Sequence, residues 1–331
     1  MTKRRLTQQQ RDRIRSIQDK RRERLTQQAD NELNQAKEQH LEGLVVTRHG
    51  QNLVVADQEG KLHHCLWRQN IGHVVCGDQV VWQSTGEKTG VVIALLDRTS
   101  ILARPDYSGR EKPLAANITQ LVVVLASEPA PSEYLLDQYL VTAETIGVKA
   151  VIAFNKVDLL NKDQANALNK RFELYKTIGY PLIRISAKFE HGLDPLIDRL
   201  RGETSILVGQ SGVGKSSLIN ALLPDQDIQV GHLSSTSGLG RHTTSASTYY
   251  SLPDGGHLID SPGVRSFRLV KLSRNQLEHG FREFGTILGN CRFNDCRHLK
   301  EPGCALQQAV AEGEIAQRRL DNFLHMVAQQ G

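Results

Sequence analysis

Between about residue 43 and residue 96, the hydrophobic pattern is that of short strands. Apolar-rich runs recur at roughly ten-residue spacing, with glycine-containing turns between them and no helical periodicity. Five such strands predict a small closed barrel of the OB type, although an SH3-like barrel would give a similar pattern. His63, His64 and His73 are expected to face solvent in it. The runs are Leu44–Thr47, Asn52–Ala56, Lys61–Trp67, Gln79–Trp82 and Val91–Leu96.

Beyond residue 113, strand-like and helix-like patterns alternate. This alternation predicts an α/β domain in which helices cover both faces of a mostly parallel sheet. A ligand should then lie beyond the carboxyl ends of the strands. The expected strands are Ile118–Ala126, Lys149–Phe154, Pro181–Ile185 and Ser205–Val208, and the expected helices are Glu133–Ile146, Ala165–Ile178 and Leu193–Leu200.

The two ends of the chain have different patterns. Residues 1–40 are rich in Gln, Arg and Lys and have no sustained apolar stripe, so we expect a disordered basic arm or simply a solvated tail. Residues 271–331 are expected to be mainly helical. An apolar stripe on a closing helix is formed by Leu306, Ala309, Val310, Ile315, Leu320, Phe323, Leu324 and Val327.

Charge is concentrated at the amino terminus. The chain carries a net charge of +5, and residues 1–28 alone hold ten lysines and arginines against three acidic residues. Non-specific affinity for nucleic acid should therefore reside in the arm. The longest apolar run, Leu121–Ala126, is far shorter than the roughly 18 residues that span a bilayer. No apolar export segment follows the basic residues, so a cytoplasmic protein without membrane contact is expected.

A phosphate-binding loop is the strongest chemical signal. A complete GxxxxGK[ST] pattern follows the strand Ser205–Val208 and precedes a predicted helix. Its backbone N–H groups can surround phosphate oxygens, Lys215 can bridge β- and γ-phosphates, and the Ser216 hydroxyl can ligate Mg²⁺. The loop consists of Gly209, Gln210, Ser211, Gly212, Val213, Gly214, Lys215, Ser216 and Ser217.

A second phosphate-side signal follows the loop along the chain. Asp260 ends a buried strand and Gly263 follows it in a DxxG arrangement, which would place Asp260 at Mg²⁺ and the Gly263 N–H at the γ-phosphate. The polar stretch 238–244 is suited to a switch loop, and Thr243 or Thr244 should supply a second hydroxyl to the metal. Val264 stands where many GTPases have a water-orienting glutamine, so His242 is the catalytic candidate, or else merely a loop residue.

The base is selected by a different part of the sequence. Asn155-Lys156-Val157-Asp158 follows a predicted strand, and the Asp158 carboxylate can accept the N1 and N2 hydrogens of guanine. Adenine would leave that carboxylate unpaired. Ser186-Ala187-Lys188 follows the next strand, where a backbone N–H can reach guanine O6. Together with the phosphate loop, these motifs predict GTP or GDP as the ligand.

Three of the five cysteines lie close together near the carboxyl terminus. Cys291, Cys296, His298 and Cys304 form a Cys₃His set, which is typical of a closed structural zinc site. Reduced buried thiols are the alternative. Cys65 and Cys76, isolated in the predicted barrel, are expected to be small core residues.

In this chain the guanine-reading motif precedes the phosphate loop. This order, the Gly240–Thr244 stretch and the Cys₃His set resemble the circularly permuted ribosome small-subunit-dependent GTPase A (RsgA) family from about residue 43 onwards. Beyond the basic arm (1–40), the resemblance implies an RNA-binding OB barrel (41–112), a permuted GTPase domain (113–270) and a helical zinc domain (271–331). It also implies a checkpoint role in late maturation of the small (30S) ribosomal subunit and its 16S rRNA.

The functional expectation is a GTP hydrolase that acts as a timer, is stimulated by ribosome binding and works as a monomer. Two other classes stay open from the residues themselves. One is an RNA-binding scaffold that senses GTP without useful hydrolysis. The other is a metabolite-linked P-loop kinase, for which no acceptor site is identifiable. The motif order also raises the hypothesis that ordering of the switch repositions the zinc domain, because the chain runs directly from Asp260–Gly263 into it.

Overall fold

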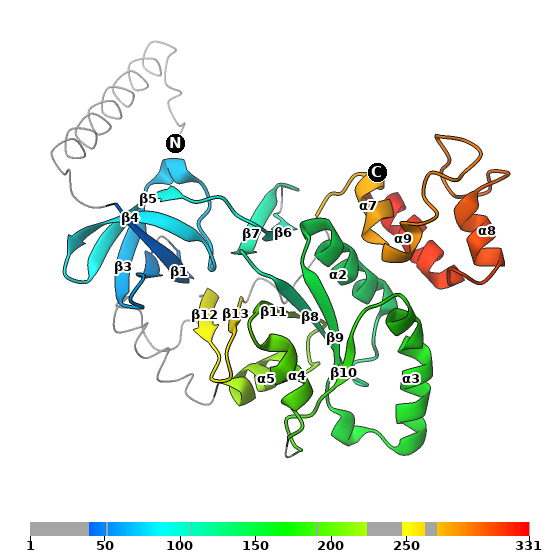
Figure 1. Cartoon of the computed structure of the whole chain (residues 1–331), viewed down its shortest axis with the longest axis horizontal. Coiled ribbons are helices and arrows are strands. Elements are labelled where there is room, and N and C mark those ends of the chain that lie inside the picture. Colours follow the sequence, from blue (N-terminus) through cyan, green and yellow to red (C-terminus); the bar gives the residue numbers. More distant parts are fainter. Residues whose placement is uncertain are drawn as a thin grey trace, which may run out of the picture. The chain divides into compact units, whose positions relative to one another are not determined.

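A computed structural model describes residues 40–50, 52–106, 108–189, 191–223, 247–261 and 270–330. Residues 1–39, the predicted basic arm, lie outside this set. Within it, a five-stranded barrel, a small hairpin, a layered α/β domain and a helical carboxyl-terminal part follow one another along the chain (Figure 1). None of the helices in the described ranges is long and apolar enough to cross a membrane.

The predicted barrel is confirmed and is of the OB type. Its strands are β1 (Leu41–His49), β2 (Asn52–Ala56), β3 (Leu62–Trp67), β4 (Gln79–Gly86) and β5 (Thr89–Leu95), with the 3₁₀ turn η1 (Gln69–Ile71) between β3 and β4. The strand order is β1-β2-β3-β5-β4, and β4 closes the barrel on β1. The parallel β3–β5 pair of this Greek-key order decides against an SH3-like meander.

The expectation that His63 faces solvent is wrong. His63 is only 6% exposed, its Nε2 lies 2.8 Å from Asp57 Oδ2, and its ring packs 4.4 Å from that of Trp82. Side chains alternate between the two faces of a strand, so His63 shares the inward face with Cys65. Gly90 makes room for this core, because a Cβ atom there would lie 2.5 Å from the Trp82 ring.

A β-hairpin that the sequence pattern did not predict follows the barrel. Strands β6 (Ile101–Pro105) and β7 (Glu111–Ala116) pair antiparallel and span the predicted domain limit at residue 112. Asp106 shapes the turn, since its Oδ1 accepts hydrogen bonds from the backbone N–H groups of Ser108 and Arg110. An Asx-type turn of this kind is the sequence signal that could have indicated the hairpin, but it lies within a polar stretch.

The α/β domain contains the predicted parallel sheet. Its strand order is β10-β9-β8-β11-β13, all parallel, and β12 is added antiparallel to β13. Strand β12 was not predicted, and it also pairs with β1 of the barrel (Figure 1). The strands are β8 (Gln120–Leu125), β9 (Lys149–Phe154), β10 (Leu182–Arg184), β11 (Thr204–Val208), β12 (Ser247–Ser251) and β13 (His257–Asp260).

Helices cover both faces of this sheet, as predicted. Leu121, Val123 and Leu125 of β8 pack on one face with α2 (Glu133–Ile146) and α3 (Lys162–Thr177). Val122 and Val124 pack on the other face with α4 (Asp194–Leu200) and α5 (Lys215–Leu222). The nearly continuous apolar run of β8 reflects burial on both sides.

The carboxyl-terminal part, which we call the metal module (residues 270–330), is helical. It contains α7 (Arg274–Gly280), the 3₁₀ turn η4 (Arg282–Phe284), α8 (Ala305–Ala311) and α9 (Gln317–Gln330). The single closing helix expected from the apolar stripe is therefore two helices. The chain turns at Gly313, whose φ of +80° suits glycine, so Leu306 lies on α8 and Phe323 on α9. Leu306 and Phe323 still belong to one apolar core.

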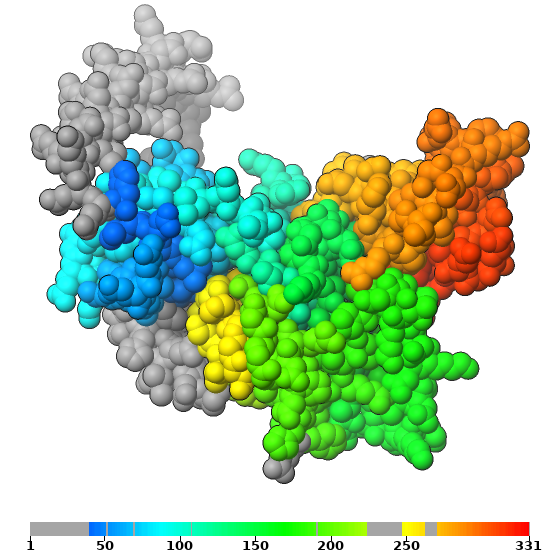
Figure 2. All heavy atoms as spheres, viewed as in Figure 1, coloured from blue at the N-terminus to red at the C-terminus, as the bar shows by residue number. Residues whose placement is uncertain are grey.

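The metal module packs on α2 of the α/β domain, where orange and green segments adjoin in Figure 2. Val141 of α2 belongs to the module's own apolar core. Arg319 of α9 is fully buried, with Nη1 2.6 Å from Asp137 Oδ1 of α2 and two hydrogen bonds to Glu283 at 2.6 and 2.9 Å. Asn322 Nδ2 and the Tyr175 hydroxyl also donate to Asp137, at 2.6 and 2.8 Å. This buried network anchors the module.

Replacing Arg319 with methionine should lower the free energy of unfolding by about 3–5 kcal/mol, because Asp137 and Glu283 would stay behind without their cation. Arg318→Met is the matched control. It removes a partly exposed pair with Glu133 and should cost about 1 kcal/mol or less. Urea titration followed by circular dichroism measures both variants. Equal losses of stability would contradict the assigned role of the buried network.

Candidate functional site

The predicted site residues follow strands that end at one edge of the sheet. Asn155 comes directly after β9, Ser186 lies two residues beyond β10, Gly209 follows β11, and Asp260 is the last residue of β13. Because these four strands are parallel, their carboxyl ends lie at the same edge. Motifs separated by more than a hundred residues are thereby collected into one site.

The glycine-rich loop after β11 leads directly into α5. Gly209, Gly212 and Gly214 have φ values of +137°, +86° and +96°, which side-chain-bearing residues rarely adopt. Lys215 begins α5, and its ammonium group donates to the carbonyl oxygens of Gly209 and Gln210, both at 2.7 Å. The loop therefore curves around its own lysine. The remaining predicted loop residues are Ser211, which is exposed, Val213, which is buried, and Ser216 and Ser217, exposed in the first turn of α5.

The motif after β9 contacts this loop directly. Asn155 is 3% exposed, and its Nδ2 donates to the carbonyl oxygen of Val213 at 2.9 Å. A Cβ atom on Gly214 would lie only 2.4 Å from that nitrogen, so the position excludes any side chain. Lys156, at φ +62°, reaches the carbonyl of Gly212 at 2.6 Å and that of Glu128 at 3.3 Å. Sequence reasoning did not identify Glu128, which precedes α2.

The motifs after β9 and β10 also meet. Asp158, in the 3₁₀ turn η2 (Val157–Leu159), accepts a hydrogen bond from the Ser186 hydroxyl at 2.7 Å, and Lys188 Nζ lies 3.3 Å from its second oxygen. The backbone N–H of Lys188 in turn donates to the Ser186 hydroxyl at 3.1 Å. Ala187, between them, is exposed. The hydrogen bond from Ser186 holds the pKa of the Asp158 carboxyl below its ordinary value, which keeps it an ionised acceptor.

The residues at the site fit a guanine nucleotide. A buried acceptor, Asn155 Oδ1, has no hydrogen-bond partner among the described residues, and Gly214 keeps side-chain atoms out of the space beside it. Asp260 is half-buried at the end of β13. His242, Thr243, Thr244 and Gly263 lie outside the described residues, as does Val264.

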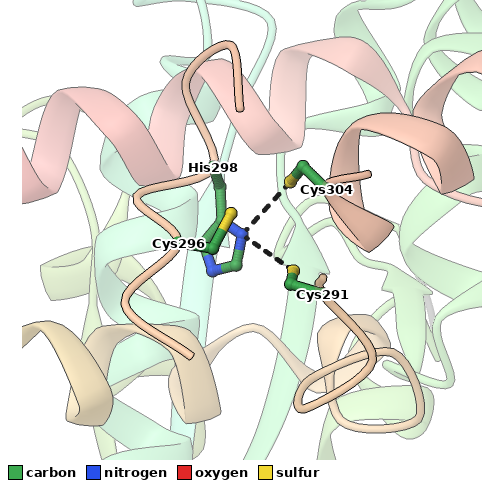
Figure 3. Close-up of side chains that lie close together, drawn as sticks. All are labelled: Cys291, Cys296, His298 and Cys304. Carbon is green, nitrogen blue, oxygen red and sulfur yellow. Dashed lines mark hydrogen bonds between the residues drawn. The ribbon is translucent and has the colours of Figure 1, made fainter. Parts of the chain in front are cut away.

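A second cluster lies in the metal module. Cys291, Cys296, His298 and Cys304 place their ligand atoms within 4.8 Å of one another (Figure 3). His298 Nδ1 lies 3.6 Å from Cys291 Sγ and 3.3 Å from Cys304 Sγ. Tetrahedral zinc with ordinary Zn–S and Zn–N bond lengths would separate such atoms by about 3.6 Å. Spacing and chemistry therefore both fit one structural metal ion.

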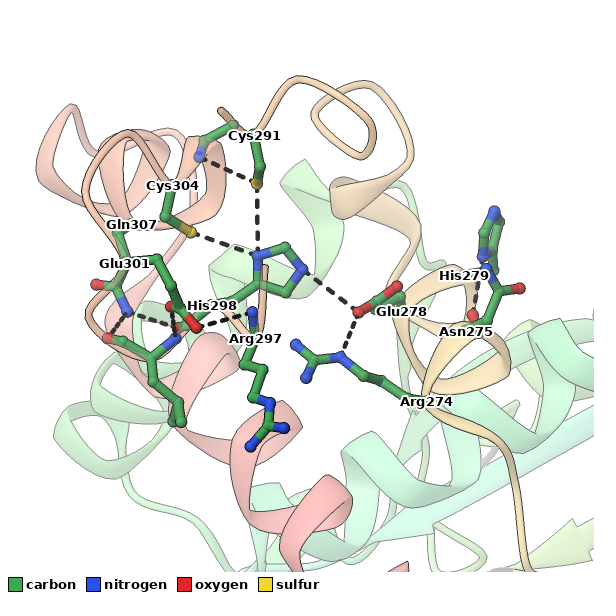
Figure 4. Close-up of polar contacts among 12 residues, drawn as sticks. Arg274, Asn275, Glu278, His279, Cys291, Arg297, His298, Glu301, Cys304 and Gln307 are labelled. Atoms are coloured by element: carbon green, nitrogen blue, oxygen red, sulfur yellow. Dashed lines mark hydrogen bonds and ion pairs between the residues drawn. The ribbon is translucent and has the colours of Figure 1, made fainter. Parts of the chain in front are cut away.

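Surrounding groups orient these ligands (Figure 4). His298 Nε2 faces Glu278 Oε1 of α7 at 3.3 Å, and Arg274 donates to the same carboxylate at 2.8 Å. Such a carboxylate fixes the ring orientation and leaves Nδ1 as the ligand atom. The loop between the ligands is held by Gln307, whose Nε2 donates to the carbonyl oxygens of His298 and Leu299. Glu278 was not identified from the sequence, because it lies 20 residues before His298.

Known proteins resemble this chain along nearly its whole length. The model of the RsgA GTPase family matches residues 95–270. The chain belongs to the RsgA GTPase family. The small ribosomal subunit biogenesis GTPase RsgA of Hahella chejuensis is 45% identical over 334 residues, covering 98% of this chain and 96% of the relative. The RsgA of Pseudomonas aeruginosa strain LESB58 is 42% identical, covering 99% and 98%.

Solved RsgA-type structures share the fold. The crystal structure of YjeQ from Thermotoga maritima superimposes with a TM-score of 0.72 at 32% identity, covering 88% of this chain and 99% of that one. YloQ, described as a circularly permuted GTPase, has a TM-score of 0.69 at 29% identity and covers 88% and 95%. The multidomain, permuted fold predicted from the motif order is confirmed. As an RsgA-family member, the chain is a GTP-hydrolysing enzyme that binds guanine nucleotide.

Gly214→Ala should weaken binding of fluorescent GDP by at least about tenfold, because the added methyl group collides with Asn155 Nδ2. Gly212→Ala is the control. Its φ is also positive, but its Cβ would lie 3.5 Å from the nearest heavy atom, in Pro129. Gly212→Ala should therefore lose less affinity for GDP, and this smaller loss reflects backbone strain alone. Equal affinities of the two variants would show that the close approach of Asn155 has no role in binding.

Elemental analysis should find one zinc ion per chain, and Cys304→Ser should lose it while Cys65→Ser, a core thiol in the barrel, retains it. Because binding of a structural metal is coupled to folding, chelation should also lower the unfolding temperature of the wild-type protein. A metal-free wild-type protein with an unchanged unfolding temperature would contradict a structural zinc site.

Proposed function

We propose that this RsgA-family enzyme hydrolyses GTP as a checkpoint in late maturation of the small (30S) ribosomal subunit, and that binding to the subunit stimulates it. The names of relatives that align over nearly their full length support the ribosomal part. One observation supports the nucleotide part. The base-reading residue Asn155 and the phosphate loop contact each other across 58 residues of sequence.

Selectivity for guanine rests on Asp158. Ser186 and Lys188 fix both oxygens of its carboxylate, and the ionised group can accept the N1 and N2 hydrogens of guanine. Adenine has no such pair of donors, so it would leave the charge desolvated and unpaired. Lys156, which spans from the base side to Gly212, would cover the ring.

At the phosphate end, Lys215 and the loop N–H groups would bind the β- and γ-phosphates. Ser216 and Asp260, with Thr243 or Thr244, would hold Mg²⁺. A magnesium ion bound there supplies charge neutralisation for the phosphates. His242 would position the attacking water, since Val264 has no polar group for this task. Without a glutamine, intrinsic turnover should be slow until a partner orders the switch.

The basic arm and the OB barrel would contact phosphates of 16S rRNA, so binding should weaken steeply with salt. The zinc ion would be structural, because a Cys₃His set leaves no open coordination position. In this proposal the protein acts as a monomer in the cytoplasm. GTP orders the switch, the GTP form docks on the subunit, and hydrolysis releases it.

Purified small ribosomal subunits should raise GTP turnover at least about tenfold, and His242→Ala should abolish most of this rise without weakening GTP binding. Asp158→Asn should lower turnover of GTP at least about 100-fold, and the variant should hydrolyse xanthosine triphosphate instead. Asp163→Asn, at an exposed position in the first turn of α3, is the control and should change neither. No stimulation of the wild-type enzyme by subunits would reject the checkpoint function.

A further inference from the structure

Helix α2 is buried on two faces, and each face contacts a different part of the enzyme. Asp137 and Val141, one turn apart, face the metal module, where Asp137 meets Arg319 and Val141 joins the module's apolar core. Tyr139 lies between them in the chain and therefore faces the opposite way, into the core under the sheet. The helix contacts β8 and β9 on this side and α7 and α9 on the other (Figure 1).

The hydroxyl of Tyr139 reaches the start of the phosphate loop. Tyr139 is 2% exposed, and the backbone N–H of Gly209 donates a hydrogen bond to its hydroxyl. Burial raises the pKa of Tyr139 to about 12, so the partner of Gly209 is an uncharged hydroxyl at neutral pH. It places no negative charge beside the phosphates that the loop would bind. Sequence reasoning did not identify Tyr139, because it reads as one more apolar position of α2.

Gly209 is held on its other sides as well. A Cβ atom there would lie 2.2 Å from the carbonyl oxygen of Val124, so the loop begins in direct contact with β8. The carbonyl oxygen of Gly209 accepts a hydrogen bond from Lys215 at 2.7 Å. Because Gly209 is buried, loss of the tyrosine hydroxyl would leave its N–H with little access to water. The path of the chain as it leaves β11 therefore depends in part on Tyr139.

The segment that leads into α2 contacts the same loop further along. Lys156 Nζ donates to the carbonyl oxygens of Gly212 and Glu128, at 2.6 and 3.3 Å. Pro129 lies beside Gly212, since its Cδ would be 3.5 Å from a Cβ atom there. The loop thus adjoins α2 at Gly209 and the lead-in of α2 at Gly212. Because packed interiors deform little, a change in how the metal module holds α2 is transmitted to the loop.

We propose that Tyr139 is a positioning residue for the phosphate loop, and that through it the attachment of the metal module to α2 contributes to nucleotide affinity. Tyr139 touches no nucleotide in this scheme. It fixes Gly209, and with it the course of the loop towards Lys215. The inference rests on the proposed role of this loop in phosphate binding. It gives the metal module an influence on the nucleotide site that does not require the module to move.

Tyr139→Phe keeps the ring and removes only the hydroxyl. It should bind fluorescent GDP about fivefold more weakly, which is the effect of one lost hydrogen bond. Tyr180→Phe is the matched control, because Tyr180 is also buried and its hydroxyl donates to Glu144 in the last turn of α2, at 3.1 Å. Both variants should lose similar stability in urea titration, but Tyr180→Phe should bind GDP like the wild-type protein. Equal GDP affinities of the two variants would overturn the proposal.

Phosphorus NMR of bound GDP gives a readout that a purely structural role would not move. At saturating GDP, the chemical shift of the β-phosphate should change in Tyr139→Phe and stay unchanged in Tyr180→Phe. The reason is that only the first substitution alters the loop around the phosphates. An unchanged β-phosphate signal in Tyr139→Phe would rule out the positioning role.

A double-mutant cycle tests the connection to the metal module. Arg319→Met should weaken GDP binding about threefold in the wild-type background and have no further effect in the Tyr139→Phe background. Asn322→Ala removes a neutral donor to Asp137 and serves in the same cycle if Arg319→Met does not fold. If the losses of affinity simply multiply, the metal module does not act through Tyr139.

The outcomes separate this inference from the proposed function. If Gly214→Ala weakens GDP binding and Tyr139→Phe does not, only the positioning role fails. If neither variant weakens it, the assignment of the phosphate loop fails as well, and with it the nucleotide part of the proposed function.

Discussion

The buried side chain of Asn155 joins the two halves of the permuted nucleotide-binding domain. Its hydrogen bond to Val213 links the half with the predicted guanine-reading motif, which comes first in the chain, to the predicted phosphate loop, which comes second. Gly214 must then lack a side chain, and Lys156 completes the join at Gly212. In the proposed function, base and phosphate recognition would both depend on this contact, which is kept in the rotated order because the parallel strands β9 and β11 end at the same edge of the sheet.

The metal module is held by a different constraint. Although the chain enters it from the half that holds the predicted switch segments, its buried contacts are with α2, in the half that holds the predicted base-reading motif. Arg319, Asp137 and Glu283 form a desolvated network that needs all its members, and Val141 adds apolar packing. Ordering of the switch cannot move the module freely while this network is intact. The hypothesis that the switch repositions the module would require the network to open.

The barrel has the opposite relation to the nucleotide site. Through β1 it pairs with β12, which lies between the predicted switch segments in the chain. The barrel thus shares one hydrogen-bonded sheet with β12 and β13, the strands that flank the predicted switch segments. RNA binding by the barrel, as proposed, would act next to the predicted switch segments, whereas the metal module is fixed to α2.

The sequence alone predicted the chemistry of the site and determined most of the fold. Phosphate-loop, base-reading and Cys₃His residues carry their meaning in residue type and spacing, and alternation of β8–β11 with helices predicted the parallel sheet. What depends on distant partners was decided only by the tertiary structure. His63 is inside the barrel because of strand register, and Arg319 is buried because Asp137 and Glu283 neutralise it. Strand β12 forms because β1 and β13 both pair with a polar segment that has no strand pattern of its own. Such features depend on pairing across the chain, which local periodicity does not encode.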